Sequence, residues 1–221
     1  MSDGGVHLAE AGIDPLEELR TIYGPRLGLH RDLYEASNAH RGAHGDGCDA
    51  YPSSPAQAPL WPLLAEITRG RRFLEIGCGL GYTAALMASA GGSSCRVDTI
   101  QADPVHADLA IKAMARKGFG GRVRVLRGRA LEILETLKRP YDVVFLDGDW
   151  REYPRYYRHI VRLTRPGSVV VTANISPLMG GWNADLPGRG EIRSYLRRLV
   201  RDRRFLTYIT RGEWHAYSVR L

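Results

Sequence analysis

The sequence predicts an α/β fold built on one mixed, seven-stranded sheet. Apolar runs of strand length alternate with amphipathic helical patterns over most of the 221 residues. Strands that are separated by helices imply parallel pairing with right-handed crossovers. Near the end of the chain, strand patterns at 205–210 and 214–219 follow each other around Arg-Gly-Glu and predict a C-terminal antiparallel hairpin. The hairpin makes the sheet mixed rather than wholly parallel.

The N-terminal part is expected to lie outside this alternation. Residues 1–14 predict a loose tail, and 15–37 predict a helix because apolar residues recur at helical spacing. Residues 38–55 are rich in Gly, His and Pro, which favours a long, mobile loop. We therefore divide the chain into a tail, helix and loop over 1–52 and a main domain over 53–221.

The main domain contains seven segments with strand character: 72–77, 97–101, 123–127, 141–147, 168–174, 205–210 and 214–219. Helical patterns precede and separate them at 60–68, 82–90, 104–117, 130–138, 153–164 and 191–201. The helix from 104 starts with proline, whose missing N–H costs nothing in a first turn. The uninterrupted run VVFL in the fourth strand predicts burial on both faces of the sheet. Residues 175–189 are expected to form a second irregular loop.

Several classes of protein are disfavoured by composition. No apolar run approaches the roughly 18 residues of a membrane span, and the N-terminus shows no signal-peptide pattern. The three cysteines, Cys48, Cys78 and Cys95, lack the paired spacing of a disulfide scaffold. We expect a cytoplasmic protein without a membrane partner.

The net charge of +7 is carried mainly by arginine, since only three of the 31 basic residues are lysines. Arginine binds phosphate and carboxylate groups well. The arginines are spread over the whole chain, which favours a solvated basic surface over a nucleic-acid site. The last long helix nevertheless carries an arginine stripe, formed by Arg193, Arg197 and Arg201. The stripe could bind a phosphate of RNA or of an acyl carrier, so this alternative stays open. No interleaved aromatic residues suggest base stacking.

A glycine-rich turn is the strongest local signal. In Phe73-Leu-Glu-Ile-Gly77-Cys-Gly79-Leu-Gly81-Tyr82-Thr83, an apolar strand leads into a turn that opens a helix. Glycine permits sharp turns and close ligand approach, and the helix N-terminus offers free N–H groups. A dinucleotide motif would place its third glycine at residue 82. The G-x-G-x-G spacing after Glu75 favours S-adenosylmethionine, with hydroxyls of Tyr82 and Thr83 as donors. An ordinary tight β–α turn is the alternative.

Five segments in order extend this observation. These segments are SSPAQA, LEIGCGLGYTA, TIQADP, YDVVFLDGD and VVVTANI. Because of them, the segment 53–221 resembles class I O-methyltransferases of the catechol and caffeoyl-CoA type. The resemblance implies a Rossmann-like methyltransferase fold with a seven-stranded mixed sheet, and S-adenosylmethionine as cofactor. It also implies methyl transfer to the hydroxyl of a small-molecule acceptor, with an aromatic acceptor as a candidate, and a homodimer. An N- or RNA methyltransferase and a non-catalytic S-adenosylmethionine-binding subunit are the alternatives.

The resemblance also assigns the cofactor-binding residues. Gln101, followed by Ala102, occupies the position where the family carries an acid for the ribose, and Asp103 is either a substitute or a helix cap. Gly128-Arg129-Ala130 resembles the adenine-contacting Gly-Asp-Ala of the family. The expected cofactor-binding residues are Glu75, Gly77, Gly79, Gly81, Tyr82, Thr83, Gln101, Ala102, Arg129, Ala130 and Asp147.

The reaction centre departs from the family. Metal-dependent relatives bind Mg²⁺ through an Asp at the position of Asp147 and an Asp-Asn pair at the fifth strand, where this chain has Ala173 and Asn174. Two oxygen ligands with one charge fall short of the octahedral set that Mg²⁺ needs, so no metal is expected. Trp150 also replaces the lysine of those relatives. Asp147, Asp149 and Asn174 are the catalytic candidates, with Asp149 as a base or a solvated turn residue.

Two further groups remain candidates. His40, His44 and Cys48 recur every fourth residue, with acids between them, and such side chains bind zinc. Because their glycine-rich context predicts no helix, the spacing alone does not bring them together, and a plain loop is favoured over a metal site or a lid carrying a base. Trp182 and Asn183, after the fifth strand, are candidates to shape an aromatic acceptor pocket.

Overall fold

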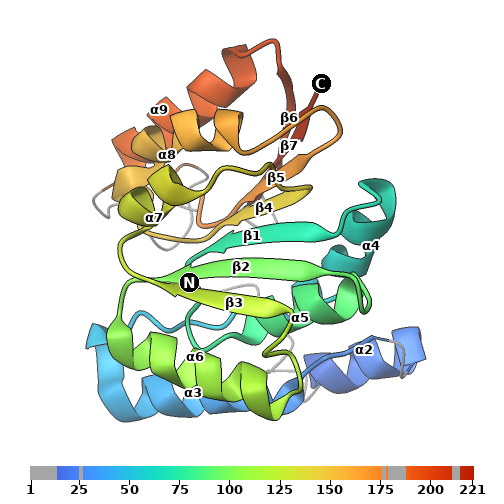
Figure 1. The fold of residues 1–221 in the computed structure, drawn as a ribbon. Helices are drawn as coiled ribbons and strands as arrows, with labels where there is room; N and C mark the ends of the chain where they lie inside the picture. The colour runs from blue at the N-terminus through green and yellow to red at the C-terminus, as the bar shows by residue number, and fades with distance from the viewer. Residues whose placement is uncertain (1–13, 25–26, 176–177, 179–187, 211–214) are drawn as a thin grey trace.

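The computed structural model describes residues 14–24, 27–175, 178, 188–210 and 215–221. Its centre is a seven-stranded sheet with the order β3-β2-β1-β4-β5-β7-β6 (Figure 1). Neighbours from β3 to β5 pair in parallel, and β7 is antiparallel to both β5 and β6. The predicted mixed sheet and hairpin are confirmed. The strands are β1 (Arg72–Ile76), β2 (Arg96–Gln101), β3 (Val123–Arg127), β4 (Val143–Leu146), β5 (Val169–Thr172), β6 (Phe205–Thr210) and β7 (His215–Arg220).

Helices cover both faces of the sheet. One hydrophobic cluster joins the sheet to residues of α3, α4, α5 and α6, and a second joins it to α7, α8 and α9, which Figure 1 shows as two groups of helices. The four residues of β4 are fully buried, as their apolar run predicts. The helices are α2 (Pro15–Tyr23), α3 (Arg31–His44), α4 (Leu60–Ile67), α5 (Tyr82–Ala90), α6 (Pro104–Arg116), α7 (Ala130–Thr136), α8 (Tyr153–Arg162) and α9 (Arg189–Arg201), with short 3₁₀ turns η2 (Gly45–Gly47), η3 (Pro55–Gln57) and η4 (Trp150–Glu152).

The predicted helix over 15–37 is wrong in its extent. α2 ends at Tyr23. Its C-cap residue Gly24 has a φ of 68° and is followed in the sequence by a proline, which disfavours helical backbone before it. α3 then continues to His44, so the loop predicted over 38–55 is wrong for residues 38–44. Packing decides this, because α3 buries Leu33 and Ser37 against the main domain and tertiary contacts override weak helix propensity.

The sheet places the ends of four parallel strands in one row. Ile76 pairs with Ile100 of β2 and with Leu146 of β4, and Leu146 pairs with Thr172 of β5. The residues that follow these positions, Gly77, Gln101, Asp147 and Ala173, therefore lie along one carboxyl edge. Strand order reverses between β1 and β4, and open α/β sheets bind ligands at this kind of point. Among the described residues, no helix is long and apolar enough to cross a membrane.

Candidate functional site

The glycine turn after β1 can be formed only by glycine at its first position. Gly77 has a φ of 101°, and a Cβ there would lie 2.2 Å from the carbonyl oxygen of Asp147. Gly79 also has a positive φ, but the nearest atoms to a Cβ at this position are 3.9 Å away, in Ala50 and Tyr51. Gly81, with a φ of 95°, begins α5. The turn thus leaves room for a Cβ at Gly79, which would just contact the backbone of residues 50–51 on the facing segment.

Glu75 is a buried carboxyl group that is only half satisfied. Its Oε2 accepts a hydrogen bond of 2.5 Å from the Thr99 hydroxyl, while Oε1 has no hydrogen-bond partner. Burial, and secondly the neighbouring Asp147, raise the pKa of Glu75 to about 8. A buried carboxyl with a free oxygen beside the glycine turn is suited to a ligand that brings a positive charge or a donor.

Asp147 follows β4 at the same edge of the sheet. Burial raises its pKa to about 7, although a hydrogen bond from the side chain of Asn174 acts in the opposite direction. Asn174 is exposed and has a φ of 58°, a left-handed conformation that asparagine tolerates better than most residues. In the part of the chain that the structure describes, no Lys or Arg forms an ion pair with Glu75 or Asp147. Among the described residues, these two carboxyl groups therefore have no compensating Lys or Arg within ion-pair distance.

The hydroxyl donors predicted on α5 have different surroundings. Thr83 is buried and its hydroxyl lies 2.8 Å from that of Ser53, which joins the segment before η3 to the glycine turn. The ring of Tyr82 lies in the hydrophobic core beside Tyr34, with ring centroids 5.4 Å apart, and its hydroxyl is buried without a partner. A contact between the cofactor and Tyr82 remains a prediction.

The side-chain amide of Gln101 forms hydrogen bonds with two backbone groups at the edge of the site. Its Nε2 donates to the carbonyl of Gly79 at 3.3 Å, and its Oε1 accepts from the backbone N–H of Asp103 at 3.1 Å. Asp103 caps α6 by accepting from the N–H of His106 at 2.9 Å. The capping alternative for Asp103 is therefore confirmed. Ala102, between them, is exposed.

The two positions after β3 lie at the start of α7. Arg129 is its N-cap residue, and its exposed guanidinium pairs with Glu152 at 3.0 Å. Ala130 is the first helical residue and packs against the second hydrophobic cluster. The side chain of Arg129 thus points to a protein carboxylate, which leaves its backbone for any contact with a base.

The contacts of Asp149 make it a poor candidate for the general base. Its carboxylate caps η4 and forms hydrogen bonds of 2.9 Å with Nε and Nη2 of Arg151. Burial alone would raise the pKa of Asp149, but these hydrogen bonds outweigh it and the pKa lies below its usual value. Trp150 packs against the second cluster, and its ring contacts Gly188 so closely that a Cβ there would lie 2.2 Å from it.

The donors at this edge do not fit Mg²⁺. Asp147 already accepts a hydrogen bond from Asn174, and Ala173 brings no side-chain oxygen. The Ala173 carbonyl accepts a hydrogen bond of 3.1 Å from the Tyr153 hydroxyl. Two side chains with a single charge do not provide the six-oxygen set that the ion prefers.

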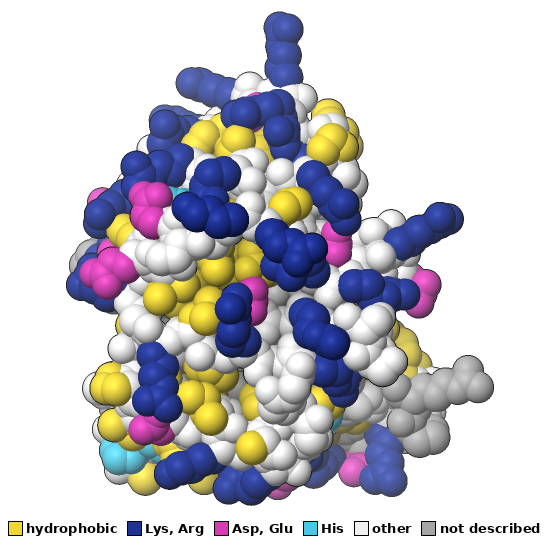
Figure 2. Space-filling view, viewed as in Figure 1, with side chains coloured by type: hydrophobic (Ala, Val, Ile, Leu, Met, Phe, Trp, Pro, Cys, Tyr) yellow, Lys and Arg dark blue, Asp and Glu magenta, His cyan; other side chains and the backbone are white. Residues whose placement is uncertain are grey.

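Two other sequence candidates lie elsewhere. The arginine stripe borders a surface hollow of about 580 Å³ on α9, together with Tyr157 of α8. On the face of the molecule that Figure 2 draws, Lys and Arg side chains are spread widely with acidic side chains among them, which supports a solvated basic surface. Trp182 and Asn183 lie outside the described residues.

Sequence reasoning missed two contacts at the site and a third one away from it. Ser53 contacts Thr83, the segment at Ala50 and Tyr51 faces Gly79, and His106 lies beside His40 and Cys48. Each pairing joins residues at least 28 positions apart, as the contact of Tyr51 with Gly79 illustrates. No periodicity of the sequence signals such contacts.

Comparison with known proteins agrees with this arrangement. A family model described as O-methyltransferase matches residues 43–199. The chain is 35% identical over 154 residues to a catechol O-methyltransferase from Niastella koreensis, and the match covers 67% of this chain and 68% of that protein. The structure of the O-methyltransferase from Bacillus cereus in complex with S-adenosylhomocysteine (SAH) is similar with a TM-score of 0.76 and 25% identity, over 93% of this chain and 96% of that one. The O-methyltransferase TomG from Streptomyces achromogenes, in complex with S-adenosylmethionine (SAM), gives a TM-score of 0.71 and 29% identity, over 85% and 88%. This chain therefore belongs to the O-methyltransferase family.

Proposed function

We propose that this chain transfers a methyl group from SAM to a hydroxyl oxygen of a small molecule, without Mg²⁺. The observation that carries the proposal is the pair of carboxyl groups, Glu75 and Asp147, beside a glycine turn and without a cationic side chain in the described residues. SAM carries a sulfonium and an ammonium group, which stabilise ionised carboxylates nearby. The family match and the cofactor complexes of similar structures support the same cofactor.

The residues at the carboxyl edge fit such a ligand. The backbone at Gly79 has room beside it, and the buried Oε1 of Glu75 lacks the hydrogen-bond partner that a cationic or donor group would supply. Gln101 retains acceptor capacity for a ribose hydroxyl, and we expect the backbone at Arg129 and Ala130, at the start of α7, to contact adenine. Bound SAM supplies an already activated methyl group, so most of the protein's contribution is to hold the acceptor in line.

The acceptor is assigned to the Asp147 and Asn174 side of the edge. Asp147, with a pKa of about 7 in the free protein, is suited to accept a proton from a hydroxyl near neutral pH. Asn174 orients Asp147 by its hydrogen bond. Asp149 is held by Arg151 and is less suited to this role. An aromatic hydroxyl is favoured, because a phenol with a pKa near 10 loses its proton more readily than an alcohol.

The proposal is tested by supplying methyl-labelled SAM with a panel of phenols and catechols, amines, and RNA. Label is expected in the phenolic products and absent from the amines and RNA, and Asp147→Asn should reduce transfer strongly. Transfer to amines or RNA in preference to phenols would contradict the assignment of the acceptor. SAH binding without transfer to any member of the panel would favour a non-catalytic subunit.

A further inference from the structure

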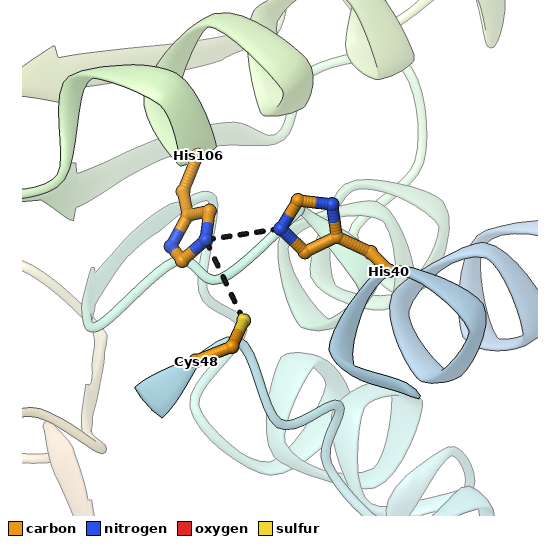
Figure 3. A group of neighbouring side chains, drawn as sticks. All are labelled: His40, Cys48 and His106. Carbon is orange, nitrogen blue, oxygen red and sulfur yellow. Dashed lines mark hydrogen bonds between the residues drawn. The ribbon is translucent and has the colours of Figure 1, made fainter. Parts of the chain in front are cut away.

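Three metal-binding side chains from distant segments meet next to the start of α6. His40 comes from α3, Cys48 from the segment after η2, and His106 from the first turn of α6. Nε2 of His106 lies 3.2 Å from Nε2 of His40 and 3.7 Å from Sγ of Cys48 (Figure 3). The three candidate ligand atoms all lie within 4.8 Å of one another. None of these residues belongs to the proposed methyl-transfer site.

We propose that His40, Cys48 and His106 bind one Zn²⁺ ion. A tetrahedral ion with Zn–N bonds of about 2.0–2.1 Å and a Zn–S bond of about 2.3 Å places two nitrogen ligands about 3.3 Å apart, and nitrogen and sulfur about 3.6 Å apart. The observed separations of 3.2 Å and 3.7 Å match these two edges. Figure 3 shows both Nε2 atoms and the sulfur turned toward a common point.

The surroundings favour a metal over a chance contact. Cys48 and His106 are buried, and His40 is half-buried. The buried Nδ1 of His106 has no hydrogen-bond partner, but Oδ1 of Asp49 lies 3.5 Å from it. A carboxylate on this side favours a proton on Nδ1, which leaves the Nε2 lone pair directed at His40 and Cys48. Carboxylates commonly support metal-bound histidines in this manner.

The donor types specify the ion. One thiolate and two imidazoles suit Zn²⁺ and other borderline-soft ions, whereas Mg²⁺ prefers oxygen ligands. Three protein ligands leave a fourth position for a water molecule or an added ligand. The half-exposed side of the cluster, at His40, is where this position would meet solvent.

A zinc ion at this site would restrain residues 48–51, which lie beside the glycine turn. Ala50 and Tyr51 follow shortly after Cys48, and their backbone atoms lie 3.9 Å from the position of a Cβ on Gly79. The guanidinium of Arg41 lies 3.8 Å over the Tyr51 ring. A metal at Cys48 would link this segment to both α3 and α6. We therefore expect zinc to strengthen SAH binding, and this consequence rests on the proposed function. By reciprocity, SAH would strengthen zinc binding equally.

The metal is tested first, without any cofactor. The tag-free chain, freed of metal by a chelator under reducing conditions, is titrated with Co²⁺ and then with Zn²⁺ against a chromophoric competitor. We expect one tight equivalent and a thiolate-to-cobalt charge-transfer band in the near ultraviolet. Cys48→Ser should abolish the band and His106→Gln should weaken zinc binding more than 100-fold. Asp49→Asn should weaken it about 10-fold.

The chain provides matched controls. Cys95→Ser changes another buried cysteine, and His30→Gln another partly buried histidine, and neither residue is in the cluster. Both variants should keep the band and the affinity. Absence of a thiolate band in the unaltered chain, or its persistence in Cys48→Ser, would overturn the site. With the metal site established, an SAH dissociation constant that does not change with zinc would overturn only the coupling to the glycine turn.

Discussion

Asn174 donates a side-chain hydrogen bond to Asp147, and this bond joins the ends of β4 and β5 at the edge where the methyl acceptor is proposed to bind. It uses one oxygen of the carboxylate and leaves the other available. The left-handed backbone of Asn174 aims its short side chain across the gap between the two strands. The pair therefore combines a weakly acidic carboxyl with a neighbour that fixes its orientation.

The first prediction concerns this pair. Asp147→Asn should lower kcat by about 100-fold or more, because it removes the proposed proton acceptor. Asn174→Ala should lower kcat by about 10-fold by freeing the carboxylate to rotate, and Asp149→Asn should have a smaller effect than either. Steady-state rates with a phenolic acceptor measure all three. A loss in Asp149→Asn as large as that in Asp147→Asn would reverse the assignment of the base.

The same carboxylate predicts a pH profile. Because burial raises the pKa of Asp147 to about 7, kcat/KM should rise with pH through that value as the carboxyl ionises. Asp147→Asn should remove this step from the profile of its residual activity. A wild-type profile that is flat between pH 6 and 8 would show that no group with this pKa takes part.

Glu75 predicts a pH dependence of stability. Its pKa is raised to about 8 in the folded protein from an ordinary value near 4.5, so the folded state binds a proton that the unfolded state has already lost between these values. Stability without cofactor should therefore fall as pH rises toward 8. Glu75→Gln should reduce this fall between pH 5.5 and 8.5 by about 1 kcal/mol or more. Denaturant unfolding at both pH values measures it, with the exposed Glu66→Gln as control. Equal pH slopes for Glu75→Gln and the unaltered chain would contradict the raised pKa.

Gly79 predicts where the cofactor approaches the backbone. SAH should raise the melting temperature by binding only the folded state. Gly79→Val should remove the shift by placing methyl groups between the glycine turn and the facing backbone of Ala50 and Tyr51. Gly118→Val is a matched control, since Gly118 also has a positive φ, of 72°, and has open surroundings. Both variants carry similar backbone strain, but only Gly79→Val should lose the response. Loss of the response in both would indicate a general effect of strain.

The next prediction concerns the contribution of Gln101, at the end of β2, to the affinity for SAH. Gln101→Leu should weaken SAH binding several-fold, because it removes the bonds to the Gly79 carbonyl and to the N–H of Asp103. Asp103→Ser should retain affinity, since serine also caps a helix. Calorimetric titration with SAH separates the two. Unchanged affinity in Gln101→Leu together with weakened affinity in Asp103→Ser would transfer the ribose contact to Asp103.

The sheet was predictable because each strand carries its own signal. The apolar run of β4 and the glycine turn after β1 are local patterns, and both occur where they were expected. The helix at residues 38–44 was not, because asparagine, histidine and glycine have weak helix propensity and the deciding contacts of Leu33 come from other elements. Likewise, Glu75 and Asp147 could be named in advance as residues on the cofactor side, but their proximity depends on the paired register of β1 and β4.

The cluster at His106 shows most clearly which contacts cannot be predicted from local sequence patterns. His40 and His106 are 66 positions apart, and Cys48 and His106 are 58 apart. The regular spacing of His40, His44 and Cys48 drew attention to the right segment, but it suggested His44 as a partner. The third ligand depends on how α3 packs beside α6, which no local pattern contains.

Methyl transfer without Mg²⁺ is tested most directly by initial rates on one preparation. The chain is stripped of metals, reloaded with one equivalent of Zn²⁺ so that the cluster at His40 is satisfied, and assayed with SAM and a phenolic acceptor, with and without millimolar Mg²⁺. Because Asp147 and Asn174 bring too few oxygens for this ion, the two rates should agree within about twofold. A rise of more than tenfold with Mg²⁺ would contradict the account and assign Asp147 and Asn174 to a metal site.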